Sequence, residues 1–219
     1  VIDDRGGGSV LLPEAFGTGA AEQPASTTLA ARVLHDAATD GLRVGALLAA
    51  RRYAGGHGDN LVAGPDLAWQ IDAAWRLRAQ WLAASTSAQP QAAPDGRTVL
   101  AEGTRRQGQR LVVKLNRQTP QWEFDATLDG SGAGFRHDTG FVAQAGTRQL
   151  ALRLARGWQG LGPFHEFWVN ATAQRTTDRD GRAVEEQFFP GLWMTGPHNL
   201  EWWVEAHVLA RARPSAAAR

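Results

Sequence analysis

The residues best suited to binding chemistry are charged and imidazole side chains that stand together in one segment. Arg136, His137 and Asp138 are consecutive, so a few residues offer a cation, an imidazole and a carboxylate. Such a set could bind a sugar or an anion. The alternative, which we favour, is an internal ion pair between Arg136 and Asp138 that holds the segment in place.

Other signals for catalysis or metal binding are weaker. The chain has no cysteine, which excludes disulfides, thiolate metal sites and cysteine nucleophiles. Residues 176–181 carry only part of the oxygen donors of a calcium loop, so they predict a hairpin tip. Glu185 and Glu186 are adjacent, and on a strand they face opposite sides, unlike the paired carboxylates of a glycosidase. We therefore expect no enzymatic activity, no cofactor and no bound metal.

Composition narrows the class of partner. The chain has 219 residues, and its 23 Lys and Arg nearly balance its 22 Asp and Glu, so it lacks the basic surface that nucleic-acid binding requires. It has nine Trp against one Tyr. Indoles are enriched where an apolar environment meets water, as at a membrane surface.

The elements that must position these residues are strands. Apolar and polar residues alternate through most of the chain, and in residues 122–129 four apolar residues alternate with four polar ones without an error. We predict an all-β fold, an antiparallel up-and-down meander of about ten strands forming all or part of a transmembrane β-barrel. Short turns are expected near residues 73, 118, 161 and 197. Longer loops are expected near 56, 95, 138 and 179, including a polar loop over 87–106.

The predicted domain organisation has three parts. Residues 1–26, rich in Gly and Pro, lack a period and predict an irregular lead-in. Residues 27–210 form the barrel or barrel segment. Residues 211–219 are expected to form a disordered tail.

Two architectures fit the alternation. One is the membrane barrel, and the other is a soluble β-sandwich or small barrel that binds carbohydrate through exposed Trp. The apolar face offers much Ala and Leu, and the opposite face carries charged or amide residues on nearly every strand, which favours the membrane barrel. The residues expected to line its lumen or mouth are Arg136, His137, Asp138, Asp66, Arg78, Glu123, Asp125, Arg153 and Glu205. Those expected to face lipid or form an aromatic girdle are Trp69, Trp81, Trp122, Phe124, Leu152 and Trp202.

Three segments resemble a known protein family. These are VIDDRGGGS at residues 1–9, AGPDLAWQ at 63–70 and, most specifically, GFRHDTGFV at 134–142. They are similar to uncharacterised bacterial proteins in which a β-barrel domain of unknown function follows a module similar to the family-nine carbohydrate-binding domains, behind a secretion signal. The resemblance runs over nearly the whole chain.

The resemblance implies an outer-membrane location in a Gram-negative bacterium, with membrane lipid as a partner. It does not specify the cargo. The mixed charge of the polar face would suit passage or uptake of polar solutes such as carbohydrates, or would plug the interior through ion pairs. The carbohydrate-binding-like module is absent here, and the single methionine is Met194. We therefore expect the chain to be a segment of a longer protein, or a degraded or truncated relative.

Overall fold

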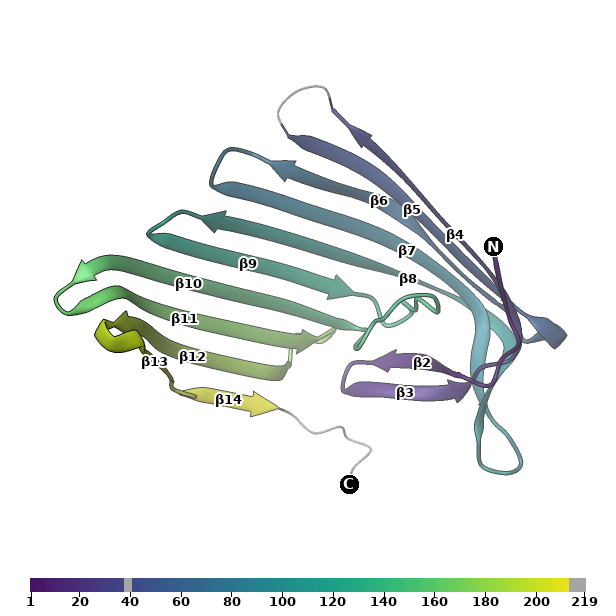
Figure 1. Ribbon diagram of the computed structural model, residues 1–219. Coiled ribbons are helices and arrows are strands. Elements are labelled where there is room, and N and C mark those ends of the chain that lie inside the picture. Colours follow the sequence, from purple (N-terminus) through teal and green to yellow (C-terminus); the bar gives the residue numbers. More distant parts are fainter. Residues whose placement is uncertain (38–40, 213–219) are drawn as a thin grey trace.

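The computed structural model describes residues 1–37 and 41–212 (Figure 1). This part of the chain is all-β. Fourteen strands belong to one sheet, and the helical segments within it are short 3-10 turns at Ala54–Gly56 and Pro197–Asn199. Within the described residues, no helix is long and apolar enough to cross a membrane.

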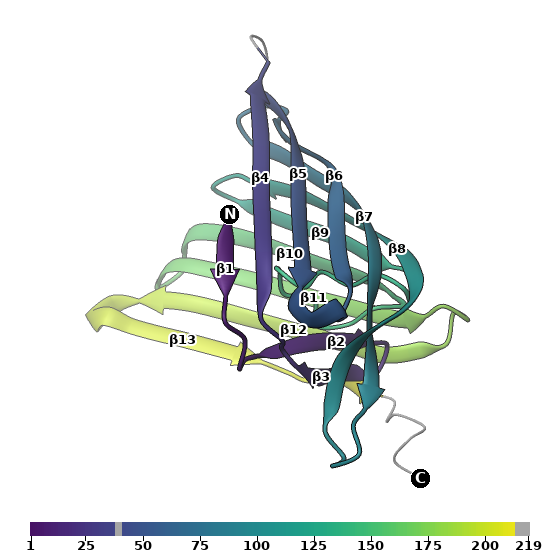
Figure 2. The ribbon, with the colours of Figure 1, turned by 90° about the vertical axis from the view of Figure 1, so that its right-hand side faces the viewer.

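Consecutive strands form the antiparallel up-and-down meander that the alternation predicts. Its ten strands are β4 (Ser26–Asp36), β5 (Leu42–Tyr53), β6 (Asp59–Gln70), β7 (Trp75–Ala92), β8 (Thr98–Gln118), β9 (Trp122–Ser131), β10 (Thr147–Leu161), β11 (Phe164–Asp178), β12 (Ala183–Gly196) and β13 (Leu200–Glu205). The predicted short turns lie at 71–74, 119–121, 162–163 and 197–199. In Figure 2, β4 runs nearly upright while β12 and β13 run across the view, so the sheet is strongly twisted and curved.

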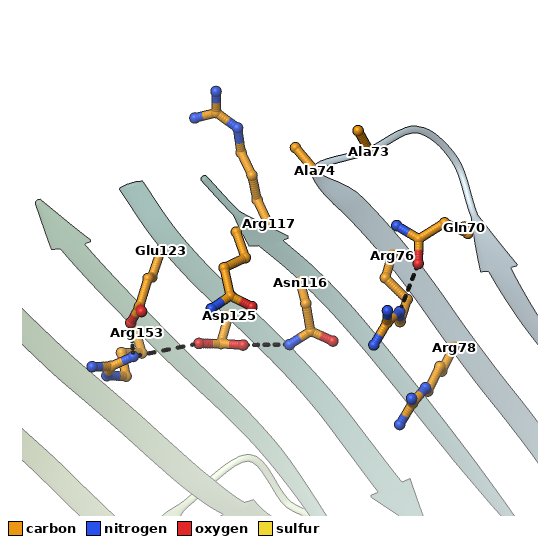
Figure 3. A pocket seen from close by; sticks show the side chains of 11 residues that line it. Gln70, Ala73, Ala74, Arg76, Arg78, Asn116, Arg117, Glu123, Asp125 and Arg153 are labelled. Carbon is orange, nitrogen blue, oxygen red and sulfur yellow. Dashed lines mark hydrogen bonds and ion pairs between the residues drawn. The ribbon is translucent and has the colours of Figure 1, made fainter. Parts of the chain in front are cut away.

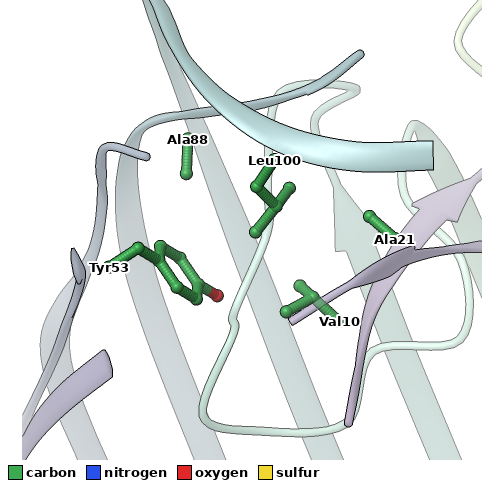
Figure 4. Close-up of a cluster of buried hydrophobic side chains, with 5 residues drawn as sticks. All are labelled: Val10, Ala21, Tyr53, Ala88 and Leu100. Carbon is green, nitrogen blue, oxygen red and sulfur yellow. The ribbon is translucent and has the colours of Figure 1, made fainter. Parts of the chain in front are cut away.

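The predicted long loop over 87–106 is wrong. β7 and β8 continue through this segment as a hairpin whose turn is 93–97, and Pro90 lies opposite Leu100. Ser, Gln and Ala suggested a loop, yet Ala88 and Leu100 are fully buried here. They pack against Val10 and Ala21 from the N-terminal segment (Figure 4), so a tertiary contact overrides the local composition.

The expectation of an irregular lead-in over residues 1–26 is also wrong. β1 (Ile2–Asp4) pairs with the start of β4, and β2 (Ser9–Glu14) and β3 (Gly17–Glu22) form a hairpin whose last residue meets β8. β1 is too short to show a period, and β2 and β3 do not alternate apolar with polar residues in the sequence. Burial of Val10 and Ala21 stabilises the hairpin instead.

The far edge of the sheet is a single bulged strand. Glu205 of β13 lies opposite Gly191, and Leu209 of β14 (Leu209–Ala212) lies opposite Phe188, so three residues of the edge strand oppose two of β12. This is a β-bulge. The predicted tail is therefore wrong for residues 211 and 212, which belong to β14, and 213–219 lie outside the described residues.

The strand register places the apolar residues of the meander on one face. Leu152 lies opposite Ala126 of β9 and Ala173 of β11, and Phe124 lies opposite Leu154. This face is open, because Leu152 is 39% and Leu154 is 50% exposed. All the described strands belong to one sheet, so they do not supply the second layer that a β-sandwich requires.

The sheet has two free edges within the described residues. β1 covers β4 only from Ser26 to Thr28, so residues 29–36 of β4 have no strand on their outer side. β13 and β14 form the other edge. The structure therefore shows an open meander rather than a closed barrel.

Candidate functional site

The candidate site is the polar face of the meander, opposite the open apolar face. Strand alternation and register together assign each predicted residue to a face. Those predicted for a lumen or mouth that lie in strands all project from the polar face, namely Asp66, Arg78, Glu123, Asp125, Arg153 and Glu205. Those predicted for lipid contact all project from the apolar face, namely Trp69, Trp81, Trp122, Phe124, Leu152 and Trp202.

An open pocket of about 520 Å³ lies on this face at the short-turn end of β6 to β10 (Figure 3). On one side of it, Arg153 pairs with Glu123 at 2.7 Å and approaches Asp125 at 3.8 Å. The amide nitrogen of Asn116 donates a hydrogen bond to the Asp125 carboxylate. These acidic side chains are therefore held by neighbouring strands.

The other side of the pocket is basic. Arg78 of β7 lies directly opposite Lys114 of β8, and neither has an ion pair with any described residue. Arg76, one position along the same face, hydrogen-bonds to Gln70. Like charges directly opposite one another repel, so this part of the face is suited to a solute that offers oxygen acceptors.

Ion pairs also link more distant strands of the polar face. Arg32 of β4 reaches across β5 to Asp66 of β6 at 2.8 Å. Gly45 of β5 lies directly opposite Asp66, and a Cβ there would lie 2.7 Å from a methyl carbon of Leu34 and 3.1 Å from the nearer Asp66 oxygen. Arg110 binds both oxygens of Asp129 at 2.9 and 2.6 Å. Ion pairs thus connect the polar side chains of different strands across this face.

The segment between β9 and β10, residues 132–146, folds onto this polar face. Phe135 is 1% exposed and packs with Val142 against Val62 and Leu82 of the sheet. The contact requires glycine at 108, because a Cβ there would overlap the backbone of Phe135. The predicted loop near residue 138 is therefore real, and it is docked rather than free.

Arg136 and Asp138 form the internal ion pair that we favoured. Arg136 binds both Asp138 oxygens at 2.6 and 2.9 Å, and the Asp138 side chain is 0% exposed. The Tyr53 hydroxyl donates to the same carboxylate at 2.8 Å. Asn60 accepts a hydrogen bond from the Asp138 backbone N–H and donates to the Arg136 carbonyl, both at 3.0 Å.

Sequence reasoning missed Tyr53 and Asn60, which complete this network. They lie on β5 and β6, far from the loop in sequence, so no local pattern marked them. His137 lies between the paired residues without joining the ion pair. Burial lowers the pKa of His137, although Asp138 acts in the opposite direction.

Tryptophan is concentrated at the short-turn end of the sheet. Every Trp except Trp81 lies within five residues of a short turn. On the apolar face, the Arg156 guanidinium lies over the rings of Trp122 and Trp158, at 4.7 and 5.4 Å from their centroids. On the polar face lie three further indoles, Trp168, Trp193 and Trp203. Sequence reasoning missed this split, although alternation with Glu166 and Asn170 marks the face of Trp168.

Residues 176–181 form the hairpin tip that their sequence predicts. Asp178 accepts backbone hydrogen bonds from Asp180 at 3.0 Å and Arg182 at 2.9 Å, which closes the turn between β11 and β12. Among the described residues, no group of three or more His, Asp or Glu is arranged to hold a metal ion.

Comparisons of this chain with protein-family models, curated proteins and solved structures give no match.

Proposed function

We propose that this chain forms part of the wall of an outer-membrane β-barrel that passes polar solutes. In this arrangement the apolar face contacts lipid tails and the polar face lines a water-filled interior. The resemblance to the bacterial barrel domain predicts the same location in the outer membrane.

The open apolar face carries the proposal. Exposed Leu and Val side chains recur on strand after strand of the meander, and Leu150 is 48%, Val169 44% and Val204 49% exposed. Monomeric soluble proteins rarely expose so large a continuous apolar surface. Transmembrane barrels require it, with polar residues at the alternating positions.

The polar face has the features that an aqueous interior requires. Its charged side chains form the ion pairs Arg32–Asp66, Arg110–Asp129 and Arg153–Glu123. The last of these lines the pocket of Figure 3. The docked segment 132–146 covers part of this face. It would narrow the interior in the way that inward-folded loops narrow or plug larger barrels.

Insertion into a bilayer requires that both sheet edges be paired, because unpaired backbone N–H and C=O groups cannot be left in hydrocarbon. We therefore propose that further strands, from elsewhere in a longer chain or from a second copy of this one, pair with the outer side of β4 and with the β13–β14 edge. These further strands would close the barrel around the polar face.

Site-directed labelling tests the proposal. Because the chain contains no cysteine, single variants L152C and A151C give one thiol on each face of β10. The chain is reconstituted in phospholipid vesicles, and each thiol is labelled with an environment-sensitive fluorophore. We expect the label at 152 to be blue-shifted and quenched by a lipid-borne quencher, and the label at 151 to be quenched by iodide in water.

The same pattern should recur at neighbouring positions of β10, with 150 and 154 behaving like 152 and 153 behaving like 151. Equal quenching by iodide at positions 151 and 152 would contradict the proposal. So would a chain that stays monodisperse without detergent and does not float with vesicles.

A further inference from the structure

A row of three indoles crosses the polar face near the short turns of β10–β11 and β12–β13. Trp168 of β11 lies opposite Trp193 of β12, and Trp193 lies opposite Trp203 of β13. Elsewhere this face carries mainly charged, amide and small side chains. Contact with lipid does not explain these three indoles, because they project away from the apolar face.

The backbone around the row leaves space for the rings. Trp168 lies opposite Gly157 of β10, where a Cβ would stand 2.6 Å from two atoms of the indole. The indole of Trp168 therefore lies over Gly157, in a space that any other residue would fill.

The other two indoles differ: a hydrogen bond holds that of Trp193, and that of Trp203 is exposed to solvent. The indole N–H of Trp193 donates to Glu201 at 2.8 Å, which fixes its position. Trp203 is 65% exposed. No ring–ring contact joins the three within the described part of the chain, so the rings are not stacked on one another.

Polar side chains flank the indole row on both sides. Toward the turns, the strand register aligns Glu166, Thr195 and Glu201, and on the other side it aligns Asn170, Gly191 and Glu205. The Asn170 amide lies over Gly191, where a Cβ would stand 3.0 Å from its oxygen. Across the described residues, the side chains of Glu166 and Asn170 make no hydrogen bond or ion pair, so their polar atoms remain available to a ligand.

We propose that Trp168, Trp193 and Trp203 form a binding platform for a neutral oligosaccharide on the polar face. A sugar ring has an apolar face of C–H groups, which packs on an indole, and a rim of hydroxyls, which needs hydrogen-bonding partners. The row supplies the indoles, and Glu166 and Asn170 supply partners. Three adjacent strands extend over about 10 Å at the usual strand spacing, which suits consecutive rings of a linear chain.

The charge around the platform selects against acidic sugars. Glu166, Glu201 and Glu205 would repel a carboxylated or sulfated ligand. This proposal rests on the proposed function, because it names the class of polar solute that the interior would pass.

Calorimetric titration of the full chain tests the platform. The probes are cellohexaose and maltohexaose, with a polygalacturonate oligomer as the acidic comparison. The detergent is lauryldimethylamine oxide, because a detergent with a sugar headgroup would compete. We expect at least one neutral probe to bind and the acidic one not to bind.

Variants locate the binding surface. Because one aromatic contact contributes modestly, W168A and W203A should each weaken binding by about 2- to 10-fold. The conservative variant W203F should retain most of the affinity, and N170A should weaken binding without removing an aromatic ring. The matched control is W202A, since Trp202 is adjacent to Trp203 but projects from the apolar face. Near-ultraviolet circular dichroism checks that each variant is folded.

Each result separates the two proposals. Absence of binding to both neutral probes, or equal loss in W202A and W203A, would overturn the platform even if the L152C and A151C labels show insertion. Binding that is weakened in W203A and N170A but not in W202A would support it. If that binding occurs while both labels report water, the platform stands and the membrane proposal fails.

Discussion

The Arg136–Asp138 ion pair anchors the segment that covers the polar face. Its two side chains are 10% and 0% exposed. Replacing one partner of a buried pair is costly, because the other charge remains buried without compensation. Tyr53 and Asn60 also hydrogen-bond to this segment, and these hydrogen bonds would be lost or distorted if the segment moved.

We expect D138N to lower the free energy of unfolding by about 3 to 5 kcal/mol, because Arg136 is left as a buried cation. It should also expose residues 132–146 to protease. Urea unfolding in micelles and limited proteolysis measure the two effects. D180N is the matched control, since Asp180 and Arg182 have the same spacing but are 50% and 65% exposed. A similar loss in both variants would contradict the anchoring role.

His137 should make the docked segment sensitive to acid. Burial lowers its pKa in the folded chain, so the unfolded chain binds the proton more readily. Stability from this group is therefore complete above the unfolded pKa of about 6.5 and falls as the pH drops through it. We expect faster amide exchange in residues 132–146 at pH 5.5 than at pH 7.5, after correction for the intrinsic rate. H137Q should remove most of that difference, and an unchanged difference would exclude His137 as its source.

At the scale of single elements, β10 shows how alternation divides one strand between two environments. Leu150, Leu152 and Leu154 project to the open apolar face, while Ala151 and Arg153 project to the polar face. Substitutions at neighbouring positions should therefore have opposite consequences in a bilayer, although the backbone around them is the same.

L152R should destabilise the membrane-inserted chain by roughly 2 to 4 kcal/mol if position 152 lies near the bilayer midplane. A151R, its neighbour on the polar face, should cost much less, because its guanidinium meets water. Reversible unfolding from phospholipid vesicles measures both. Equal costs at 151 and 152 would mean that the two faces of β10 meet the same environment.

At the scale of the whole molecule, the sheet formed by the described residues is open and has two free edges. Residues 29–36 of β4 and the β13–β14 strand present unpaired backbone groups. Such edges pair readily with other strands, so they are also where an isolated chain would associate.

Hydrogen exchange can locate these edges in solution. For the monomeric chain in micelles, we expect the outward N–H groups of residues 29–36 to exchange much faster than those of β8 and β9, which are paired on both sides. Protection of β4 equal to that of β8 would show that this edge is paired. Analytical ultracentrifugation then distinguishes pairing with a second copy from pairing within one chain.

Local patterns predicted most of the meander. The uninterrupted alternation of residues 122–129 corresponds to β9, and the predicted turn positions near 73, 118, 161 and 197 are correct. They failed for residues 1–26 and 87–106, where strands are short or rich in Ala, Ser and Gln. Those strands are stabilised by contacts such as Leu100 with Val10, which join segments distant in the sequence.

The sequence by itself determined the face of most side chains in the strands that alternate clearly, because a strand has a period of two, and it favoured the Arg136–Asp138 pair, because opposite charges stand two residues apart in one loop. Only the tertiary structure decided which residues meet across strands. Tyr53 and Asn60 reach Asp138, and Trp168, Trp193 and Trp203 fall in one row, because turn lengths and strand register set these alignments. Only the tertiary structure also shows the strand order, which leaves two edges of the described sheet without a neighbouring strand.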